Sequence, residues 1–352
     1  MRTGIAEMPL HYGKAPRWLF EKMVKLSRAI IEVAVIEKGA NEFLRRISDP
    51  FWFQAFGSVL GFDWHSSGVT TTVCGAMKQG TKDISKELGI YFCGGKGGAS
   101  RKTPVQIQKI SERLAMNPIR LIYASKLSAK VDNTCVQDGY NLYHHMFIFT
   151  KDGNWSVIQQ GMNPENHIAR RYHWLSSNVK SYTCEPHTAI CCERKQACLN
   201  MVALESKSSR NIVTTIAKEH PDQILKETKK ILRMPTRHPV VNLDINPKYF
   251  HKILLKTYEQ SPDNFEKLIS IQGVGPKTIR ALALIGELLY GETPSFRDPA
   301  RYSFAHGGKD GYPFPVNKKT YNNSIAFLES AIKKAKIGQT DKLKALKRLA
   351  FI

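Results

Sequence analysis

The sequence predicts an α+β protein, with a mixed α/β domain over residues 1–203 followed by an all-helical domain over residues 204–352. In the first part, runs of β-branched and aromatic residues alternate with segments of helical spacing, and two of the runs flank a hairpin turn. In the second part, apolar residues recur at helical spacing throughout, and prolines stand where helices begin.

The first half of the mixed domain is predicted to contain a helix and two strands. Residues 16–38 carry apolar side chains at helical spacing, which predicts an amphipathic helix. The β-branched run over residues 69–74 predicts a buried strand, and residues 89–93 predict another.

The second half of this domain is predicted to contain a helix and a β-hairpin. Thr103 can cap a helix and Pro104 suits its first turn, so a helix is expected from there to about residue 116. Residues 140–149 and 155–160 flank Lys151-Asp-Gly-Asn, a strong signal for a tight turn between antiparallel strands.

The second domain is predicted to consist of helices. Seven segments have helical spacing, namely residues 210–218, 221–232, 247–258, 262–270, 276–290, 319–335 and 341–349. A loop over residues 291–316 is rich in Gly, Pro and aromatic residues, and a loop of that length inside a compact domain is more often functional than idle.

The charge of the chain favours a polyanionic partner. It has 52 Lys and Arg against 30 Asp and Glu, a formal net charge of +22. Nucleic acid is the usual partner of so basic a protein, and a general solubility charge is the alternative.

The sequence predicts a cytoplasmic protein with no membrane partner. No apolar run approaches the roughly 18 residues that span a bilayer, and basic residues such as Lys14, Arg17 and Lys22 interrupt any signal-peptide pattern. Seven cysteines, an odd number, fit an intracellular protein better than a secreted disulfide framework.

The turn between the predicted helices 262–270 and 276–290 has the composition of a phosphate site. Gly273 and Gly275 lack Cβ, so the turn can take φ > 0 and its amides can approach a ligand closely. Pro276 suits the first position of the second helix. That helix then opens with free N–H groups beside Lys277 and Thr278.

Residues 268–285 resemble a helix-hairpin-helix element, the module with which repair and replication proteins grip a DNA backbone. The resemblance implies sequence-independent DNA binding. The contacts would come from Gly273, Val274, Gly275, Lys277 and Thr278. The alternative is an ordinary turn between two packed helices.

The chain also resembles a mainly archaeal family whose function is unassigned. The resemblance lies in Arg2-Thr-Gly-Ile-Ala6, residues 13–19, Gly61-Phe-Asp-Trp-His-Ser-Ser-Gly68 and residues 303–311. It implies a prokaryotic intracellular protein and no particular activity.

A partial resemblance to helix-hairpin-helix DNA glycosylases concerns two residues. Lys277 stands at the position of their catalytic lysine, and Asp298 follows 21 residues later, where those enzymes have an essential Asp. The resemblance implies that the amine attacks the sugar C1′ and that the carboxylate stabilises the transition state.

A metal-dependent phosphodiesterase site is the leading prediction for the mixed domain. The candidates are Asp63, His65, His144, His145 and Asp138, with Asp132 also nearby in sequence, and Lys126 and Lys130 would hold phosphate. Asp63 and His65 would share one face of a strand, whereas the adjacent His144 and His145 must point to opposite faces. The expected cofactor is Mg²⁺ or Mn²⁺, and core histidines and turn aspartates are the alternative.

A Gly-rich basic segment follows the predicted strand at residues 89–93. It can form a backbone nest for phosphate, with Lys96, Arg101 and Lys102 on the DNA or RNA backbone. The segment is not a Walker A loop, so no nucleotide cofactor is expected. A flexible connector is the alternative.

Two further clusters suggest binding. Cys184, His187, Cys191 and Cys198 could hold zinc, although their spacing matches no standard finger and buried thiols or a disulfide are the alternatives. Arg170 and Arg171 open a basic-aromatic stretch that could stack on unpaired bases, or pack its aromatic side chains inward.

Three functional hypotheses follow. The first is a DNA-repair nuclease that acts on damaged or branched DNA with a divalent metal. The second is a DNA glycosylase or lyase that uses Lys277 and Asp298. The third is a non-catalytic nucleic-acid-binding factor that works with other repair proteins.

Overall fold

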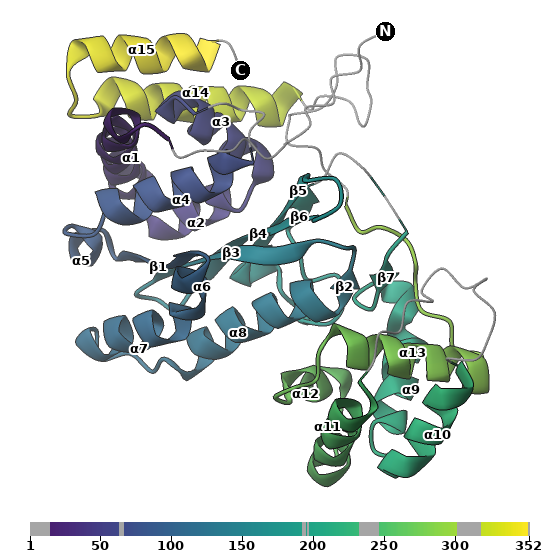
Figure 1. Cartoon of the computed structure of the whole chain (residues 1–352). Helices are drawn as coiled ribbons and strands as arrows, with labels where there is room; N and C mark the ends of the chain where they lie inside the picture. The colour runs from purple at the N-terminus through teal and green to yellow at the C-terminus, as the bar shows by residue number, and fades with distance from the viewer. Residues whose placement is uncertain are drawn as a thin grey trace, which may run out of the picture.

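A five-stranded antiparallel sheet lies between two groups of helices in the computed structural model of the chain (Figure 1). The structure describes residues 15–62, 67–191, 195, 197–231, 246–300 and 318–350. Helices and an antiparallel sheet share the chain, so the α+β class is confirmed.

The sheet has the strand order β1-β3-β4-β5-β6. Its strands are β1 Ile90–Lys96, β3 Asn141–Thr150, β4 Trp155–Met162, β5 Ala169–Leu175 and β6 Ala189–Cys191. A second, two-stranded sheet pairs β2 Val136–Gln137 with β7 Leu199–Asn200. The predicted hairpin is confirmed, since β3 pairs with β4 in a register that sets Phe149 opposite Trp155.

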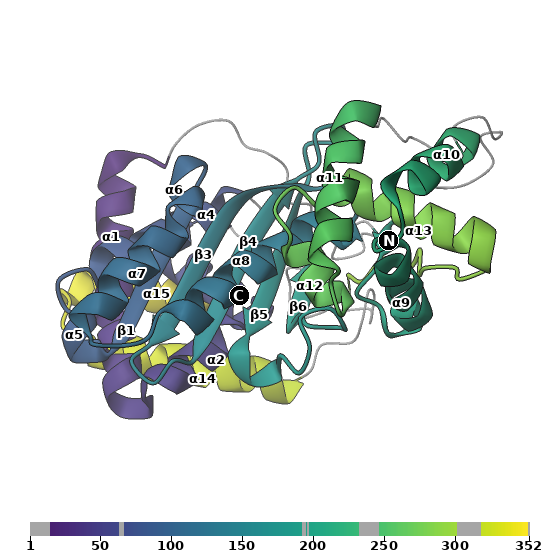
Figure 2. The same ribbon diagram turned by 90° about the horizontal axis from the view of Figure 1, so that it is seen from below.

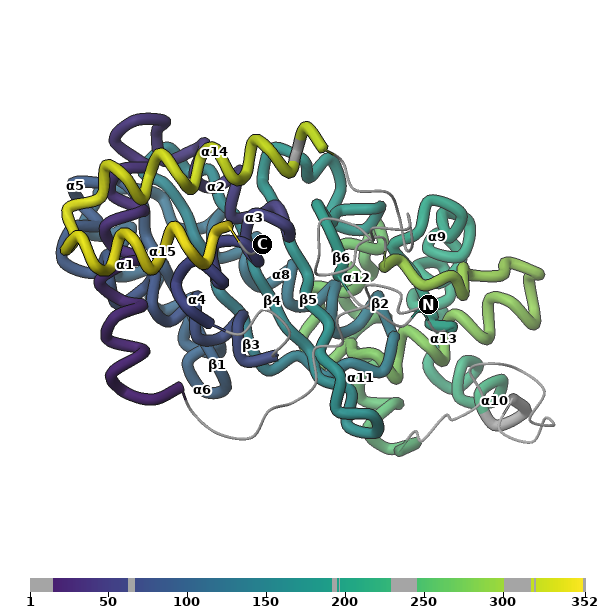
Figure 3. The backbone as a smooth tube through the Cα atoms, turned by 90° about the horizontal axis from the view of Figure 1, so that it is seen from above, coloured from purple at the N-terminus to yellow at the C-terminus, as the bar shows by residue number. Residues whose placement is uncertain are grey.

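One face of the sheet is covered by helices from both ends of the chain. The N-terminal helices are α1 Arg17–Lys38, α2 Ala40–Ile47, α3 Pro50–Leu60, α4 Gly68–Gly80 and the short α5 Ser85–Leu88. The two last helices, α14 Lys318–Lys334 and α15 Gln339–Ala350, lie over α1 and α3 (Figure 3). Together they form one core with the residues of β3 and β4 that face them, Met146, Ile148 and Ile158.

The opposite face carries α6 Gly98–Arg101, α7 Thr103–Arg113 and α8 Ile119–Thr134 (Figure 2). Beside α8 follow α9 Lys207–Ile216, α10 Pro221–Ile231, α11 Pro247–Gln260, α12 Phe265–Ser270 and α13 Pro276–Tyr290, with two 3₁₀ turns, η1 Ser176–Asn178 and η2 Leu204–Ser206. Phe147 and Phe149 of β3 share a second core with these helices. Helix α8 therefore joins the sheet to the group α9–α13.

The predicted strand at residues 69–74 is wrong, because this segment belongs to α4. Val69, Val73 and Met77 recur every four residues and all three are fully buried, so they form one helical face. That face packs on α3, where a Cβ at Gly57 would lie 2.7 Å from Val69 Cγ2. Tertiary packing overrides the β propensity of the run.

The helices predicted after residue 204 are all present, but they are shared between two cores. Helices α9–α13 join the core under the sheet, whereas Leu328, Ile332 and Leu349 of α14 and α15 join the N-terminal core. An amphipathic pattern predicts that one face of a helix is buried, but it does not predict which part of the protein covers that face. Among the described residues, no helix is both long and apolar enough to cross a membrane.

The return of α14 to the N-terminal helices predicts a stability effect. Ile332 is fully buried, so Ile332→Ala should lower the free energy of unfolding by about 2–5 kcal/mol, measured by urea denaturation. Leu343→Ala on α15, where the side chain is 52% exposed, is the control and should change little. Equal stability of the two variants would show that α14 does not dock in this way.

Candidate functional site

The turn between α12 and α13 uses its two glycines differently. Gly273 has φ +102°, and a Cβ there would lie 2.3 Å from Ile253 Cδ1, so glycine is required for the fold. Gly275 is extended, with φ −131°, and the nearest atom to a Cβ would be Gly273 O at 3.8 Å. The left-handed turn is therefore confirmed at Gly273, whereas Gly275 is a half-exposed cap with open space in front of it.

The other three residues of this turn that were predicted to contact DNA differ in their exposure to solvent. Lys277 is exposed at the start of α13, whereas Val274 and Thr278 are buried, with Val274 in the core under the sheet. The side chains of Val274 and Thr278 therefore hold the turn in place and are not available to a ligand. That leaves Gly273, Gly275 and Lys277 at the surface of the turn.

Polar contacts tie the α12–α13 pair to the sheet side of the molecule. Gln137 of β2 donates from Nε2 to Pro276 O at 2.9 Å and accepts from Arg280 Nε at 2.7 Å. Tyr123 of α8 donates to Glu266 of α12 at 2.5 Å, and burial together with this hydrogen bond raises the pKa of Tyr123 to about 12. The hydroxyl therefore stays a donor, and the position of the turn is fixed relative to α8.

A pocket of about 410 Å³ lies between α7, α8 and the start of β3, and we refer to it as the basic pocket. Its lining includes Arg101, Lys126, Lys130, Ser125 and His145. The lining thus includes both histidines, His144 and His145, and both lysines of the predicted phosphodiesterase site, together with one arginine of the Gly-rich segment. Lys96 and Lys102 are exposed on that segment and do not line the pocket.

The Gly-rich segment is not the predicted loop, because Gly94 and Gly95 belong to β1, Gly98 begins α6, and Gly97 alone lies between the two elements. Gly94, Gly95 and Gly97 all have positive φ, which favours glycine. A Cβ at Gly94 would lie 2.1 Å from His145 O, so this glycine lets β1 approach β3 at the pocket.

A chain of buried hydrogen bonds leads from the basic pocket through the core. Ser125 Oγ lies 2.9 Å from His145 Nε2, and His145 Nδ1 lies 2.8 Å from Gln159 Oε1. Gln159 Nε2 donates to Asp132 Oδ2 at 2.5 Å, and Asp132 Oδ1 lies 2.5 Å from His187 Nε2. Both ring nitrogens of His145 are engaged, so in this arrangement His145 is not a metal ligand.

The histidine next to it, His144, points to the opposite face of the sheet, as the sequence predicts. Its two ring nitrogens have no hydrogen-bond partner among the described residues, and burial lowers its pKa to about 3. The other predicted ligands, Asp63 and His65, lie outside the described residues. Within the part of the chain that the structure describes, no group of three His, Cys, Asp or Glu side chains that could hold a metal ion lies at the two histidines.

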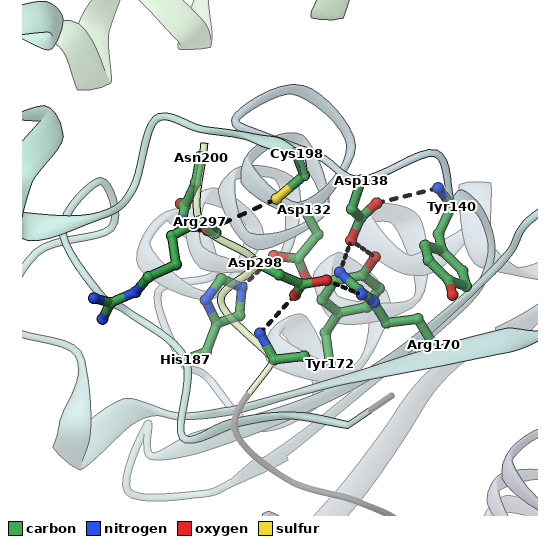
Figure 4. A network of polar contacts seen from close by, with 11 residues as sticks. Asp132, Asp138, Tyr140, Arg170, Tyr172, His187, Cys198, Asn200, Arg297 and Asp298 are labelled. Atoms are coloured by element: carbon green, nitrogen blue, oxygen red, sulfur yellow. Dashed lines mark hydrogen bonds and ion pairs between the residues drawn. The ribbon is translucent and has the colours of Figure 1, made fainter. Parts of the chain in front are cut away.

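This series of hydrogen bonds ends at a larger pocket, of about 560 Å³, which His187 and Asp298 both line. Figure 4 shows the polar contacts of these residues. Arg170 donates to Asp298 Oδ2 and to Asp138 Oδ2, both at 2.7 Å, and Tyr172 also donates to Asp138 Oδ2 at 2.7 Å. Burial raises the pKa of Asp138, and Arg170 opposes that shift. Asp138 is therefore part of this arginine network and not of the basic pocket.

Arg170 and Arg171 are not accessible, so the prediction that these two arginines contact nucleic acid is wrong. Arg170 and Arg171 are 0% exposed and point to opposite faces of β5. Arg171 donates to Gln54 Oε1 at 3.2 Å and to His173 Nε2 at 2.8 Å, and its guanidinium lies 4.4 Å from the centre of the Phe53 ring. The aromatic residues of this stretch, Tyr172 and Trp174, are also fully buried.

The two residues of the glycosylase resemblance do not share a pocket. Asp298 is held by Arg170 in the larger pocket, with its side chain 4% exposed. Lys277 is exposed on α13 and is not part of the lining of that pocket.

Each of the four predicted zinc ligands contacts a different partner. His187 contacts Asp132, Cys198 donates to Arg297 O at 3.9 Å, Cys184 is hydrogen-bonded to Arg210, and Cys191 lies against Arg171. All six cysteines that the structure describes are free thiols. Within the described ranges, no three His, Cys, Asp or Glu side chains are grouped to hold a metal ion.

The contacts missed by sequence reasoning join residues far apart in the chain. Asp132 meets His187 at a separation of 55 residues, and Arg170 meets Asp298 at a separation of 128 residues. Ser125 carried no signal, because a serine inside a helix is ordinary. No local pattern could have identified these pairs.

The burial of neutral His144 predicts a pH dependence of stability. Its folded pKa is lowered to about 3 from an ordinary value near 6.5, so the stability it contributes is present above pH 6.5 and is lost as pH falls from 6.5 towards 3. The free energy of unfolding should depend less steeply on pH in His144→Leu. Between pH 4.5 and 6 the slope should fall by about 1.4 kcal/mol per pH unit, which corresponds to one proton. Urea denaturation at several pH values measures this, and an unchanged slope would contradict the assignment.

The sequence matches the family described as "Protein of unknown function (DUF763)" over residues 4–316. The match covers the sheet, both pockets and the α12–α13 turn. No curated protein and no solved structure matches the chain. The family is one of unassigned function, as the sequence predicts, and its archaeal distribution stays a prediction. The chain belongs to this family.

Proposed function

We propose that this protein binds DNA along the phosphate backbone at the α12–α13 turn and hydrolyses a phosphodiester in the basic pocket. It is then a DNA-processing nuclease that acts on damaged or branched DNA. The observation that carries the proposal is the open N-terminus of α13, where Gly275 leaves space for a phosphate.

The binding step rests on the start of α13, a helix of 15 residues. The first amides of such a helix have no partner within the helix, and the helix dipole favours an anion there. Gly275 has no Cβ to keep a phosphate away, and Lys277 is exposed beside it. This arrangement supports the likeness to the helix-hairpin-helix module.

The hydrolytic step is supported by the position of α8. This helix contacts α12 and α13 and also carries Lys126 and Lys130 into the basic pocket. A DNA strand bound at the turn would therefore lie beside α8, and the two lysines of α8 could contact a neighbouring phosphate of that strand. The net charge of +22 attracts a polyanion to the protein.

A divalent cation, Mg²⁺ or Mn²⁺, remains part of the proposal as a prediction. Asp63 and His65, on which it was based, lie outside the described residues. A lyase that uses Lys277 with Asp298 is less favoured, because Arg170 occupies the Asp298 carboxylate. Borohydride trapping on abasic DNA separates a lyase from a nuclease.

Binding at the turn is tested with Gly275→Val. Valine adopts an extended backbone readily and meets open space here, so the fold should be kept while the branched side chain obstructs the phosphate. We expect DNA affinity to fall by roughly tenfold for all sequences alike, measured by fluorescence anisotropy at fixed salt. Gly338→Val, at another glycine with open space, should bind as the wild type does. Equal affinity of the two variants would remove the turn from DNA binding.

Hydrolysis is tested on plasmid, flap and branched DNA with and without a chelator. Lys126→Ala and Lys130→Ala should lower the cleavage rate by about 10–100-fold while binding at the turn persists. Lys109→Ala, an exposed lysine of α7 that does not line the pocket, is the control. If DNA is bound but stays intact under Mg²⁺ and Mn²⁺, the protein is a binding factor and not a nuclease.

A further inference from the structure

We propose that Ser125 is the nucleophile of the basic pocket, with His145 as its general base, and that it attacks the phosphorus of a phosphodiester. The inference deepens the proposed hydrolysis and rests on it for the class of substrate. Ser125 was not predicted from the sequence, and the assignment comes from its contacts.

The geometry is that of an activated hydroxyl. Ser125 Oγ lies 2.9 Å from His145 Nε2, and the opposite nitrogen, Nδ1, lies 2.8 Å from Gln159 Oε1. A nucleophile, a base within hydrogen-bond reach and a third group that orients the base are the three parts of such a site. Ser125, His145 and Gln159 all line the same pocket.

The orientation of the Gln159 amide is fixed by its other neighbours. Gln159 Nε2 lies 3.3 Å from Ser128 O, a carbonyl oxygen that can only accept. The same nitrogen lies 2.5 Å from Asp132 Oδ2, which also accepts from Trp174 Nε1 at 3.0 Å. The NH₂ end of Gln159 therefore faces these acceptors, and its oxygen faces His145.

This orientation fixes the tautomer of His145. Because Gln159 Oε1 is an acceptor, His145 Nδ1 carries the proton and Nε2 keeps its lone pair. Ser125 then donates its hydroxyl proton to Nε2, which is the direction that general-base catalysis needs. Burial lowers the pKa of His145, so the imidazole is neutral and able to accept a proton near pH 7.

The charge of the lining selects the substrate. Arg101, Lys126 and Lys130 surround the approach to Ser125, and no acidic side chain is among the described residues that line the pocket. Three cations suit an anionic phosphodiester and the further charge that its transition state develops. A neutral carboxylic ester carries no charge that would pair with these three cations.

The reaction proceeds in two balanced steps. Ser125 Oγ forms a bond to phosphorus while His145 takes its proton, one ester P–O bond breaks, and the leaving oxygen receives that proton from Nε2. The intermediate is a phosphodiester of Ser125 that keeps the other ester of the substrate; water attacks its phosphorus, His145 takes a proton from the water, and Oγ leaves and regains a proton. The net reaction is phosphodiester plus water giving a phosphomonoester and an alcohol.

The inference is tested with an alkyl fluorophosphonate, which reports on the nucleophile without DNA. Attack by Ser125 forms the P–O bond and releases fluoride, so the intact mass should rise and the adduct should map to Ser125. Ser125→Ala should lose the label, and His145→Gln should slow labelling by about 100-fold or more. Ser100→Ala is the matched control, because Ser100 lines the same pocket but donates to Gly97 O at 2.6 Å.

The outcomes separate this inference from the proposed function. Wild-type protein that is folded by circular dichroism but unlabelled overturns the inference, as does a label that persists in Ser125→Ala. A label on Ser125 with intact DNA supports the nucleophile and removes DNA as its substrate. Cleavage of DNA at equal rates by wild type and Ser125→Ala keeps the nuclease and removes Ser125 from it.

Discussion

The arrangement of both pockets depends on one buried carboxylate, that of Asp132. It is 0% exposed and is held by side chains from β4, from β5 and from the loop before β6, namely Gln159, Trp174 and His187. A buried carboxylate is tolerated only where donors surround it, so these three side chains cannot turn elsewhere without cost. Asp132 thereby sets the tautomer of His145 on one side through Gln159 and positions His187 at the larger pocket on the other.

The second organising contact is the arginine between two carboxylates. Arg170 joins Asp138, just after β2, to Asp298, which follows α13, and all three side chains are almost fully buried. The segment that leaves α13 is thus fastened to β5 by an ion pair and to β7 by the bridge between Ser295 and Asn200. Together with the Gln137 contacts to α13, these contacts fix the position of the proposed binding turn relative to the sheet.

What could be predicted from the sequence was local, and what could not was a pairing of distant residues. The β3–β4 hairpin, α1, α7 and the helices on either side of Gly273 follow from spacing, caps and turn residues, all of which act within a few positions. The segment 69–74 misled because β-branched residues are also accepted in a helix that packs tightly, here on Gly57. The burial of Arg170 could not be foreseen, since it depends on a carboxylate 128 residues away. The zinc prediction was based on the kinds of residue near one another in the sequence, whereas a zinc site needs their side chains to meet at one point in space.

The depth of Ser125 limits which DNA could react. Ser125 is only 2% exposed, so a phosphate reaches its hydroxyl only by entering the basic pocket. In a regular duplex the backbone is held by stacked base pairs, and drawing one phosphate inward costs deformation energy. A flap, a branch or a damaged site has already lost part of that stacking, so its backbone enters at a lower cost. Backbone binding at the α13 terminus carries no sequence information. If the proposed nuclease is selective for distorted DNA, that selectivity would therefore arise from the recessed position of Ser125 and not from base recognition.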